Sequence, residues 1–162
     1  MSTDRFHKNS TAKVADTNTG VLWTRPKTPD VPTPLIHDGL VYICMHDGVF
    51  QCLDAKTGKV HWTYDLLAAT WSTPLIVEDK VYIGDEDGDV TVFKLAAEQE
   101  QLAEVNMGNS VYSTPIVADN VLYIANRTHL FAIENNAKPV EANPPTAGQK
   151  AASAGEKGKS DD

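Results

Sequence analysis

Hydrophobic and polar residues alternate in short runs through the middle of the chain, and the same succession of runs occurs three times. Each time, a proline and two aliphatic residues precede a short polar turn, and an apolar run with a central tyrosine follows. The prolines are Pro34, Pro74 and Pro115, spaced by 40 and 41 residues, and Tyr42, Tyr82 and Tyr123 each lie eight residues after one of them. A period of about forty residues is typical of units that bury their apolar faces only by stacking on one another.

The apolar runs predict β-strands, because they are rich in β-branched and aromatic residues. We predict two hairpins in each repeat and place the three tyrosines on equivalent second strands. The dipeptides Asp47-Gly48 and Asp87-Gly88 are turn signals for the second hairpin. Residues 95–105 have the most helix-like spacing, and we interpret them as a polar loop followed by a degenerate outer strand. The sequence therefore predicts an all-β protein.

Composition divides the chain into three parts. We place the repeats within residues 14–136, and the three units span about 31–65, 71–106 and 112–135. Residues 1–13 are predicted to be a flexible N-terminus. Residues 137–162 are rich in Pro, Gly, Ala, Ser and Lys, with no large apolar residue after Val140. Such a segment buries too little surface to offset its ordering entropy, so we predict a disordered tail.

The acidic balance of the chain excludes one class of partner. Residues 29–137 carry five lysines and arginines against sixteen acidic residues, and the whole chain has a net charge of -8. Such a surface repels phosphate backbones, so we expect no nucleic-acid binding. No apolar run approaches the ~20 residues that a membrane-spanning helix needs, so we expect no membrane span.

Two cysteines, Cys44 and Cys52, flank the second hairpin of the first repeat. A two-residue turn at Asp47-Gly48 pairs Ile43 with Cys52 and places Cys44 on the opposite face of the hairpin. A bulge would instead bring the two sulfurs opposite each other. We favour two free, buried thiols over a disulfide. No third ligand lies nearby in the sequence, so a metal site is not expected here.

The most specific string in the chain runs from Cys52 to Trp62. An apolar strand ends before Asp54, whose side chain caps a turn, and Gly58 supplies the positive φ that the turn requires. Trp62 lies on the next strand, where burial of its indole leaves one N–H to be paired. Residues 14–23, which end at Trp23, repeat this pattern one residue shorter. The second full repeat has lost this pattern, and residues 95–105 stand where its glycine and tryptophan would be expected.

These motifs closely resemble the tryptophan-docking repeat of the pyrroloquinoline-quinone (PQQ)-type β-propellers, a family that includes quinoprotein alcohol dehydrogenases and BamB-like outer-membrane assembly proteins. The resemblance covers residues 16–134. The matching residues are Cys52, Asp54, Thr57, Gly58 and Trp62 in the docking string, and Val81, Tyr82, Gly84, Asp87 and Gly88 in the hairpin. The resemblance implies a partial β-propeller of about three four-stranded antiparallel blades. It also implies that Trp62, and by the same pattern Trp23, docks on the turn of an adjacent blade.

The resemblance does not extend to the chemistry of the quinoprotein enzymes. Those enzymes hold the quinone and a calcium ion in a full ring, with a disulfide between adjacent cysteines and a carboxylate as general base. This chain has no adjacent cysteine pair, and its three repeats are too few for a ring. We therefore predict no cofactor, no metal site and no catalytic residue.

Two further patterns are not interpreted as active sites. Residues 85–89 are rich in acid but lack the glycine and glutamate spacing of an EF-hand loop. We interpret them as a hairpin turn with solvated acids. The five histidines are scattered over different repeats, and no Gly-x-Ser-x-Gly motif is present.

One surface is a candidate binding rim. Trp71 and Tyr112 occupy the same position in successive repeats, immediately before Ser-Thr-Pro. The loop between the second and third strands of each repeat opens on the same end. The candidate rim comprises Trp71, Tyr112, Asn109, Glu86, Asp87 and Arg127, joined by Ser110, His46, Asp47 and Asn126. Aromatic groups among polar ones suit contact with a protein or a small ligand. The alternative is that Trp71 and Tyr112 only pack between blades.

The expected function is a non-catalytic binding or assembly scaffold. The alternative is a C-terminal fragment of a PQQ-dependent quinoprotein dehydrogenase whose catalytic blades are missing. Because three blades leave apolar faces and strand edges uncovered, we expect a protein partner, missing propeller blades or self-association. Residues 21–23 are expected to form the outer strand of a blade whose three inner strands are missing. This expectation favours the interpretation of the chain as the C-terminal part of a longer propeller. The family resemblance implies a location in the cell envelope, periplasm or outside the cell.

Overall fold

The computed structural model describes residues 20–27 and 29–138, and every regular element in this part of the chain is a β-strand. The strands form three separate antiparallel sheets in sequence order, which we call blades 1, 2 and 3. The predicted all-β, propeller-like fold is confirmed. The predicted flexible residues 1–13 and nearly all of the predicted tail lie outside the described residues.

Blades 1 and 2 each have four strands, and blade 3 has three. Blade 1 consists of β1 (Leu35–His37), β2 (Leu40–Cys44), β3 (Val49–Asp54) and β4 (Val60–Asp65). Blade 2 consists of β5 (Leu75–Val77), β6 (Lys80–Gly84), β7 (Asp89–Lys94) and β8 (Gln101–Asn106). Blade 3 consists of β9 (Ile116–Ala118), β10 (Val121–Ala125) and β11 (Leu130–Ile133). Neighbouring strands in each blade are consecutive in the chain, as short hairpin connections require.

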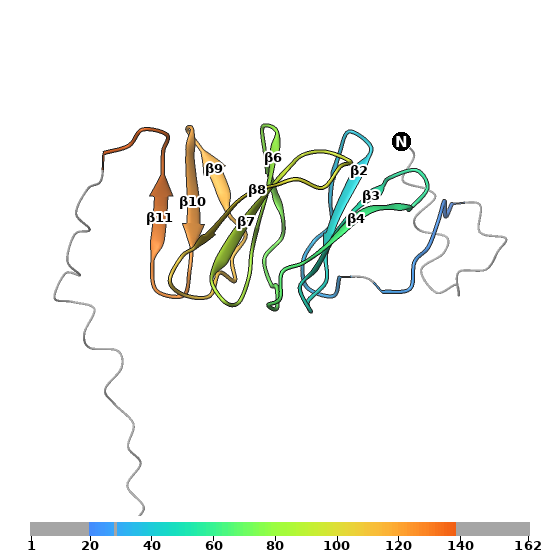
Figure 1. Ribbon diagram of the computed structural model, residues 1–162, viewed down its shortest axis with the longest axis horizontal. Coiled ribbons are helices and arrows are strands. Elements are labelled where there is room, and N and C mark those ends of the chain that lie inside the picture. Colours follow the sequence, from blue (N-terminus) through green and yellow to red (C-terminus); the bar gives the residue numbers. More distant parts are fainter. Residues whose placement is uncertain (1–19, 28, 139–162) are drawn as a thin grey trace, which may run out of the picture.

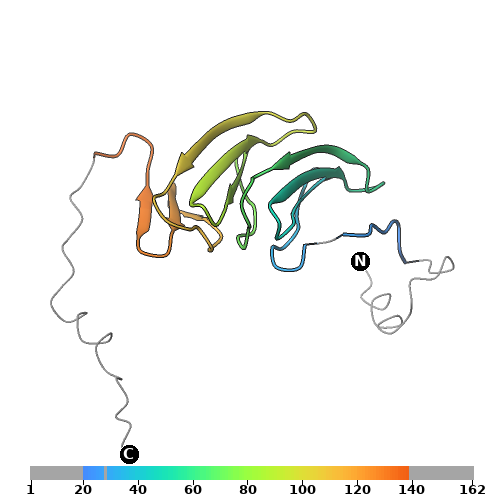
Figure 2. The ribbon, with the colours of Figure 1, turned by 60° about the horizontal axis from the view of Figure 1, so that its bottom comes forward.

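The three blades stand side by side in a curved row, with blade 2 in the middle (Figures 1 and 2). The tyrosines Tyr42, Tyr82 and Tyr123 lie on the second strands β2, β6 and β10, as predicted. Residues 95–100 form a loop and β8 follows it, which confirms the interpretation of that stretch as a loop and an outer strand.

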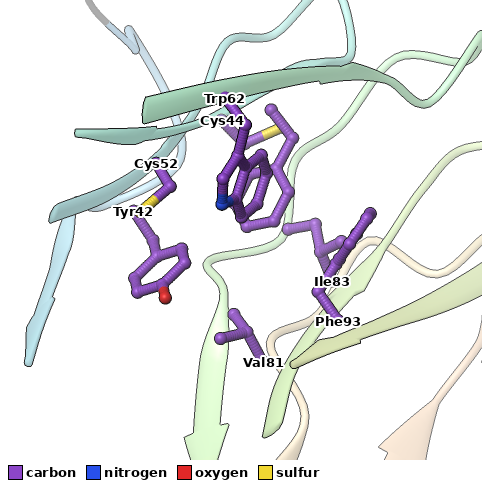
Figure 3. Packing of buried hydrophobic residues seen from close by; sticks show 8 residues of the cluster. Tyr42, Cys44, Cys52, Trp62, Val81, Ile83 and Phe93 are labelled. Carbon is purple, nitrogen blue, oxygen red and sulfur yellow. The ribbon is translucent and has the colours of Figure 1, made fainter. Parts of the chain in front are cut away.

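The main hydrophobic core lies between blades 1 and 2 (Figure 3). Its buried members from blade 1 are Tyr42, Cys44, Phe50, Cys52 and Trp62, and those from blade 2 are Val81, Ile83 and Phe93. Alternation along each strand puts these residues on the two facing sheet surfaces. The rings of Trp62 and Phe93 stack at 5.5 Å with an interplanar angle of 27°. The two blades are therefore joined by a dense aromatic contact.

The core between blades 2 and 3 is smaller. Its buried residues are Val90, Val111 and Ile124, with Tyr82, Met107 and Leu122 packed around them. Val111 belongs to the linker between the blades, and a Cβ on Gly84 would lie only 2.5 Å from its Cγ1. Glycine at position 84 thus allows the linker to approach the end of β6.

The predicted placement of the two cysteines on opposite faces is wrong. Cys44 pairs with Phe50 and Cys52 pairs with Tyr42, so both thiols face blade 2 from the same side of the sheet. The loop between β2 and β3 is longer than a two-residue turn, because Met45 N–H donates to Val49 O and Gly48 takes a φ of 87°. This longer loop shifts the register by one residue, which exchanges the faces. Both cysteines are free and buried.

The predicted outer strand at residues 21–23 is also not observed. Residues 20–27 contain no strand, although Trp23 itself is half-buried against blade 1. A strand needs a ladder partner, and no third strand of a preceding blade is present among the described residues.

A hydrogen-bonded ladder of threonines joins the segments that immediately precede the first strands of the three blades. Thr33 N–H donates to Thr73 Oγ1 at 3.0 Å, and Thr73 N–H donates to Thr114 Oγ1 at 2.9 Å. These threonines precede the repeating prolines, so the sequence period itself marks the contact. From the sequence alone the motif indicates only the start of a strand, and the ladder was not predicted.

Candidate functional site

The turn after β3 is built by Asp54 and Gly58. The Asp54 Oδ1 accepts hydrogen bonds from Thr57 Oγ1 and Thr57 N–H, both at 2.7 Å, and from Lys56 N–H at 3.1 Å. The bonds from Thr57 lower the pKa of the Asp54 carboxyl, because they stabilise its charged form. Gly58 has a φ of 71°, which side chains rarely allow.

Trp23 lies on this turn. Its Nε1–H donates to Ala55 O at 3.0 Å, and a Cβ on Gly58 would lie 2.6 Å from the indole Cδ2. The glycine therefore serves two purposes, since it permits the backbone conformation and leaves room for the ring. Arg25 extends the contact, with its Nη2 donating to Gln51 Oε1 at 2.6 Å.

Trp62 makes the corresponding contact one blade later. Its side chain is 7% exposed, and its Nε1–H donates to Ala96 O at 3.2 Å in the loop between β7 and β8. Cys52, which pairs with Trp62 across the sheet, directs its thiol toward the same carbonyl at 3.8 Å. Each indole thus ties its own segment to the outer turn of the next blade.

Blade 2 has no docking tryptophan among its described residues. The ladder pairs Cys52 with Trp62 in blade 1, and Val92 with Ala103 at the matching place in blade 2. Ala103 is exposed, as is every other residue of β8. The outer half of the contact between blades 2 and 3 therefore lacks the aromatic packing found between blades 1 and 2.

The residues of the candidate rim lie at the opposite end of the strands from these turns. Linkers and hairpin loops meet there through backbone hydrogen bonds. They run from Thr70 N–H to His46 O, from Glu86 N–H to Ala69 O, from Val111 N–H to Asp85 O and from Arg127 N–H to Ser110 O. Each of these loops comes from one blade and contacts the linker beside it. The rim is therefore continuous across all three blades.

Three rings form a row along this rim. His46 and Trp71 meet edge to face at 4.3 Å, and Trp71 meets Tyr112 in the same manner at 6.2 Å. Trp71 is 44% exposed and Tyr112 is 39% exposed, so both rings present a face or an edge to solvent. The His46 Nδ1 lies 3.2 Å from Thr70 O, which makes Nδ1 the protonated nitrogen because a carbonyl only accepts.

Polar groups surround the rings. Glu86, Asp87 and Arg127 are exposed, and Asn109 is half-buried, with its Oδ1 accepting from Ser110 N–H at 2.9 Å. Beside His46 lies an open hollow of about 300 Å³, lined by Lys27, Asp30, Met45, His46 and Asp47. The structure brings the predicted rim residues to one end of the molecule, with the acidic groups in the hairpin loops beside the linkers that carry Trp71 and Tyr112.

Asp85 departs from the prediction that residues 85–89 carry solvated acids. The residue is only 2% exposed, and its Oδ1 accepts from Asp89 N–H at 2.9 Å. Burial raises the pKa of the Asp85 carboxyl, and the hydrogen bond from Asp89 opposes that rise. The carboxylate organises the hairpin loop, which leaves Glu86 and Asp87 as the exposed acids of this loop.

These residues do not form the site of the quinoprotein enzymes. Within the described residues, no three His, Cys, Asp or Glu side chains are grouped to hold a metal ion. The Asp85 carboxylate accepts from backbone N–H groups of its own loop, and the two cysteines are not adjacent in sequence. The donor groups in the described part of the chain therefore do not fit a calcium-bound quinone. The same part contains no helix long and apolar enough to cross a membrane.

Comparison with known proteins gives a consistent picture. Outer membrane protein assembly factor BamB from Yersinia pestis is 27% identical over 119 residues, covering 62% of this chain and 30% of that protein. The crystal structure of BamB from Moraxella catarrhalis matches with a TM-score of 0.55 and 23% identity, over 62% of this chain and 32% of that one. This chain thus spans about a third of the length of these relatives.

A third similarity is weaker. Quinohemoprotein alcohol dehydrogenase from Comamonas testosteroni aligns with a TM-score of 0.49 and 24% identity, over 60% of this chain and 17% of that one. This level of similarity is too low to bear on function. By contrast, the family described as outer membrane protein assembly factor BamB matches residues 9–155, nearly the whole sequence. The chain belongs to the BamB family of PQQ-type β-propeller repeat proteins.

Proposed function

We propose that this chain is a non-catalytic scaffold that binds a protein partner of outer-membrane protein assembly in the cell envelope, through the rim that carries Trp71 and Tyr112. The observation that carries the proposal is the row of rings from His46 to Tyr112, half-exposed and continuous over three blades. Large, rigid aromatic side chains are enriched among residues that dominate binding energy at protein interfaces. The role for which the relatives are named, outer-membrane protein assembly, supplies the setting.

The construction of the rim supports this proposal. The rings are held by backbone hydrogen bonds of the loops beneath them, so they are ordered before a partner arrives. A preorganised surface loses little conformational entropy on binding. Glu86 and Asp87 in the loop of blade 2, and Asp47 next to His46, give the rim an acidic border that favours a partner with basic groups.

Site-specific photocrosslinking in the envelope of the source organism tests the proposal. A photoreactive phenylalanine analogue replaces Tyr112 in one version of the protein and Lys59 in a control version. Lys59 is exposed in the turn at the other end of the blades. We expect a crosslink to an outer-membrane assembly component from position 112, its loss in Trp71→Ala, and none from position 59. Equal crosslinking from both positions, or none from position 112, would contradict the proposal.

The alternative, a fragment of a PQQ-dependent dehydrogenase, is tested by adding PQQ with calcium. We expect no chromophore to remain bound after gel filtration and no dye-linked oxidation of alcohol. Stoichiometric retention of the quinone would favour the dehydrogenase fragment over the scaffold.

A further inference from the structure

Blade 3 has an open edge among the described residues. The strand order of its sheet is β11-β10-β9, so β11 has a partner on one side only. The hydrogen bond from Asn126 N–H to His129 O shows which residue pairs of the β10–β11 ladder exchange hydrogen bonds and which do not. It directs the N–H and C=O groups of Leu130 and Ala132 away from β10. In blades 1 and 2 the corresponding edge is covered by β4 and β8.

The surface beside this edge is apolar and exposed. Leu130 is 70% exposed and Ile133 is 43% exposed, and Val105 of β8 in the neighbouring blade is 55% exposed. An apolar edge without a partner strand is a template for the addition of another strand. The position therefore calls for a fourth strand that carries apolar side chains.

Residues 21–24 have the sequence of such a strand. They read Val-Leu-Trp-Thr, and the first residues of β4 read Val-His-Trp-Thr. Trp23 also makes the contact of a fourth strand with the next blade, because its indole donates to Ala55 O as that of Trp62 donates to Ala96 O. The other half of the arrangement is a third strand beside residues 21–24, and no such strand is present in the described part of the chain.

The two unmatched halves lie at opposite ends of the row of blades. Residues 20–27 lie beyond blade 1, and β11 lies at the far side of blade 3 (Figures 1 and 2). Blade 2 and both of its interfaces separate them, so one copy of the chain in this arrangement cannot bring them together. Two copies can.

We propose that residues 21–24 of one copy of this chain add to the free edge of β11 in a second copy and form the fourth strand of its blade 3. The register follows from blade 1, where Cys52 pairs with Trp62 and Leu53 pairs with Val60 across a bulge. Ala132 pairs with Tyr123 as Cys52 pairs with Tyr42, so Ala132 and Cys52 occupy equivalent positions in their blades. In the proposed assembly Trp23 therefore lies opposite Ala132, and Val21 lies opposite Ile133.

This contact has a defined polarity. One copy donates a strand and the other receives it, so the interface is heterologous, and further copies extend the array or close it into a ring. Leu22, 85% exposed, corresponds to His61, which is exposed in the completed blade 1. Its side chain is therefore expected to remain in solvent in the assembly.

Sedimentation velocity of the whole chain over a hundredfold range of concentration tests the proposal. We expect association that increases with concentration. Ala132→Pro removes an outward N–H, and Val21→Asp places a charge against Ile133. Each variant is expected to weaken association about tenfold or more, the effect of losing roughly 1.4 kcal/mol of backbone bonding or packing. Leu22→Asp adds the same charge beside position 21 and is expected to leave association unchanged.

Mixing the two defective variants gives a sharper test. Ala132→Pro still donates a strand, and Val21→Asp still receives one, so an equimolar mixture is expected to form a one-to-one dimer that neither variant forms alone. Hydrogen exchange of the wild type supplies an independent measurement, with slowed exchange at the Ala132 amide only in the associated state. A monomer at all concentrations, association unaffected by both substitutions, a mixture that stays monomeric, or unchanged exchange at the Ala132 amide would overturn the proposal.

Discussion

The indole N–H of Trp62 in blade 1 donates a 3.2 Å hydrogen bond to the backbone carbonyl of Ala96 in blade 2. The ring around that N–H is buried and contacts Phe50 and Phe93, with centroids 5.5 Å away in each case. One side chain thus supplies both a polar and an apolar connection between two blades. This relationship makes the interface between blades 1 and 2 the more robust of the two.

Truncation of this side chain is expected to be costly. Trp62→Ala leaves a cavity in the main core and removes the indole hydrogen bond to the Ala96 carbonyl, which retains only the Tyr42 hydroxyl and the Cys52 thiol as donors. We expect a loss of about 3–5 kcal/mol in the free energy of unfolding. Trp71→Ala is the matched control, because it removes the same side chain from a half-exposed site. Urea titration of both variants measures the difference. A loss below about 1 kcal/mol for Trp62→Ala would contradict the docking role.

Substitution of two glycines with positive φ distinguishes the cost of backbone strain from the cost of a steric clash. Gly39 has a φ of 80°, and a Cβ added there would have nothing within 4 Å, whereas a Cβ on Gly58 would lie 2.6 Å from the Trp23 ring. Gly39→Ala is expected to cost about 1 kcal/mol through strain alone. Gly58→Ala is expected to cost more and to expose Trp23 to quenching by iodide. Equal losses of stability would show that Trp23 does not rest on this turn in solution.

The serine of the repeating Ser-Thr-Pro motif has different surroundings in two blades. Ser72 is buried, donates to Gly84 O at 2.9 Å and accepts from Gly84 N–H at 3.1 Å. Ser113 is exposed and donates only to Ala125 O among the hydrogen bonds observed for its hydroxyl. We expect Ser72→Ala to cost about 1–3 kcal/mol and Ser113→Ala less than about 1 kcal/mol. Thermal unfolding of the two variants provides the measurement, and the reverse order would be inconsistent with this structure.

The two buried thiols are expected to make the folded protein less stable at alkaline pH. Burial raises the pKa of Cys44 from 9.0 to about 12 and that of Cys52 from 9.0 to about 11. The folded state then retains protons that the unfolded state releases, so stability falls as the pH rises from about 9 toward the folded pKa values. Burial also raises the pKa of Tyr42, which adds to the effect above about pH 10.

Urea titrations between about pH 8 and pH 11 measure this dependence. We expect the slope of stability against pH to become shallower in Cys44→Ala and Cys52→Ala, whatever their absolute stability. The same thiols are expected to react with Ellman's reagent at about pH 8 only as fast as the protein unfolds, because thiolates are the reactive species. Rapid reaction of both thiols in the native state would show that the core between blades 1 and 2 is open.

Part of the architecture could be read from local sequence. The prolines and tyrosines recur with a period of 40 and 41 residues, and each tyrosine lies on the second strand of its blade. Alternation of apolar residues depends on the two faces of one strand, which is a property of neighbouring residues. The string from Asp54 to Trp62 likewise forms its turn through contacts within a few residues.

The register of the hairpin at Cys44 could not be read in this way. The dipeptide Asp47-Gly48 fits both a two-residue turn and the longer loop that is present, and the two differ by one residue in pairing. Packing against blade 2 favours the register that buries both Cys44 and Cys52 with Trp62. The choice between the faces therefore depends on a neighbouring blade.

The strands, the repeat and the family follow from the order of residues along the chain, because they depend on residue type, spacing and local turn geometry. Which side chains are buried between blades depends instead on how the repeats stack. Stacking places Asp85 in the interior, Trp71 and Tyr112 in one row, and Thr33, Thr73 and Thr114 in one ladder. Each of these contacts joins residues about forty positions apart or depends on the blade beside it. No local pattern encodes them, since they arise only between neighbouring repeats.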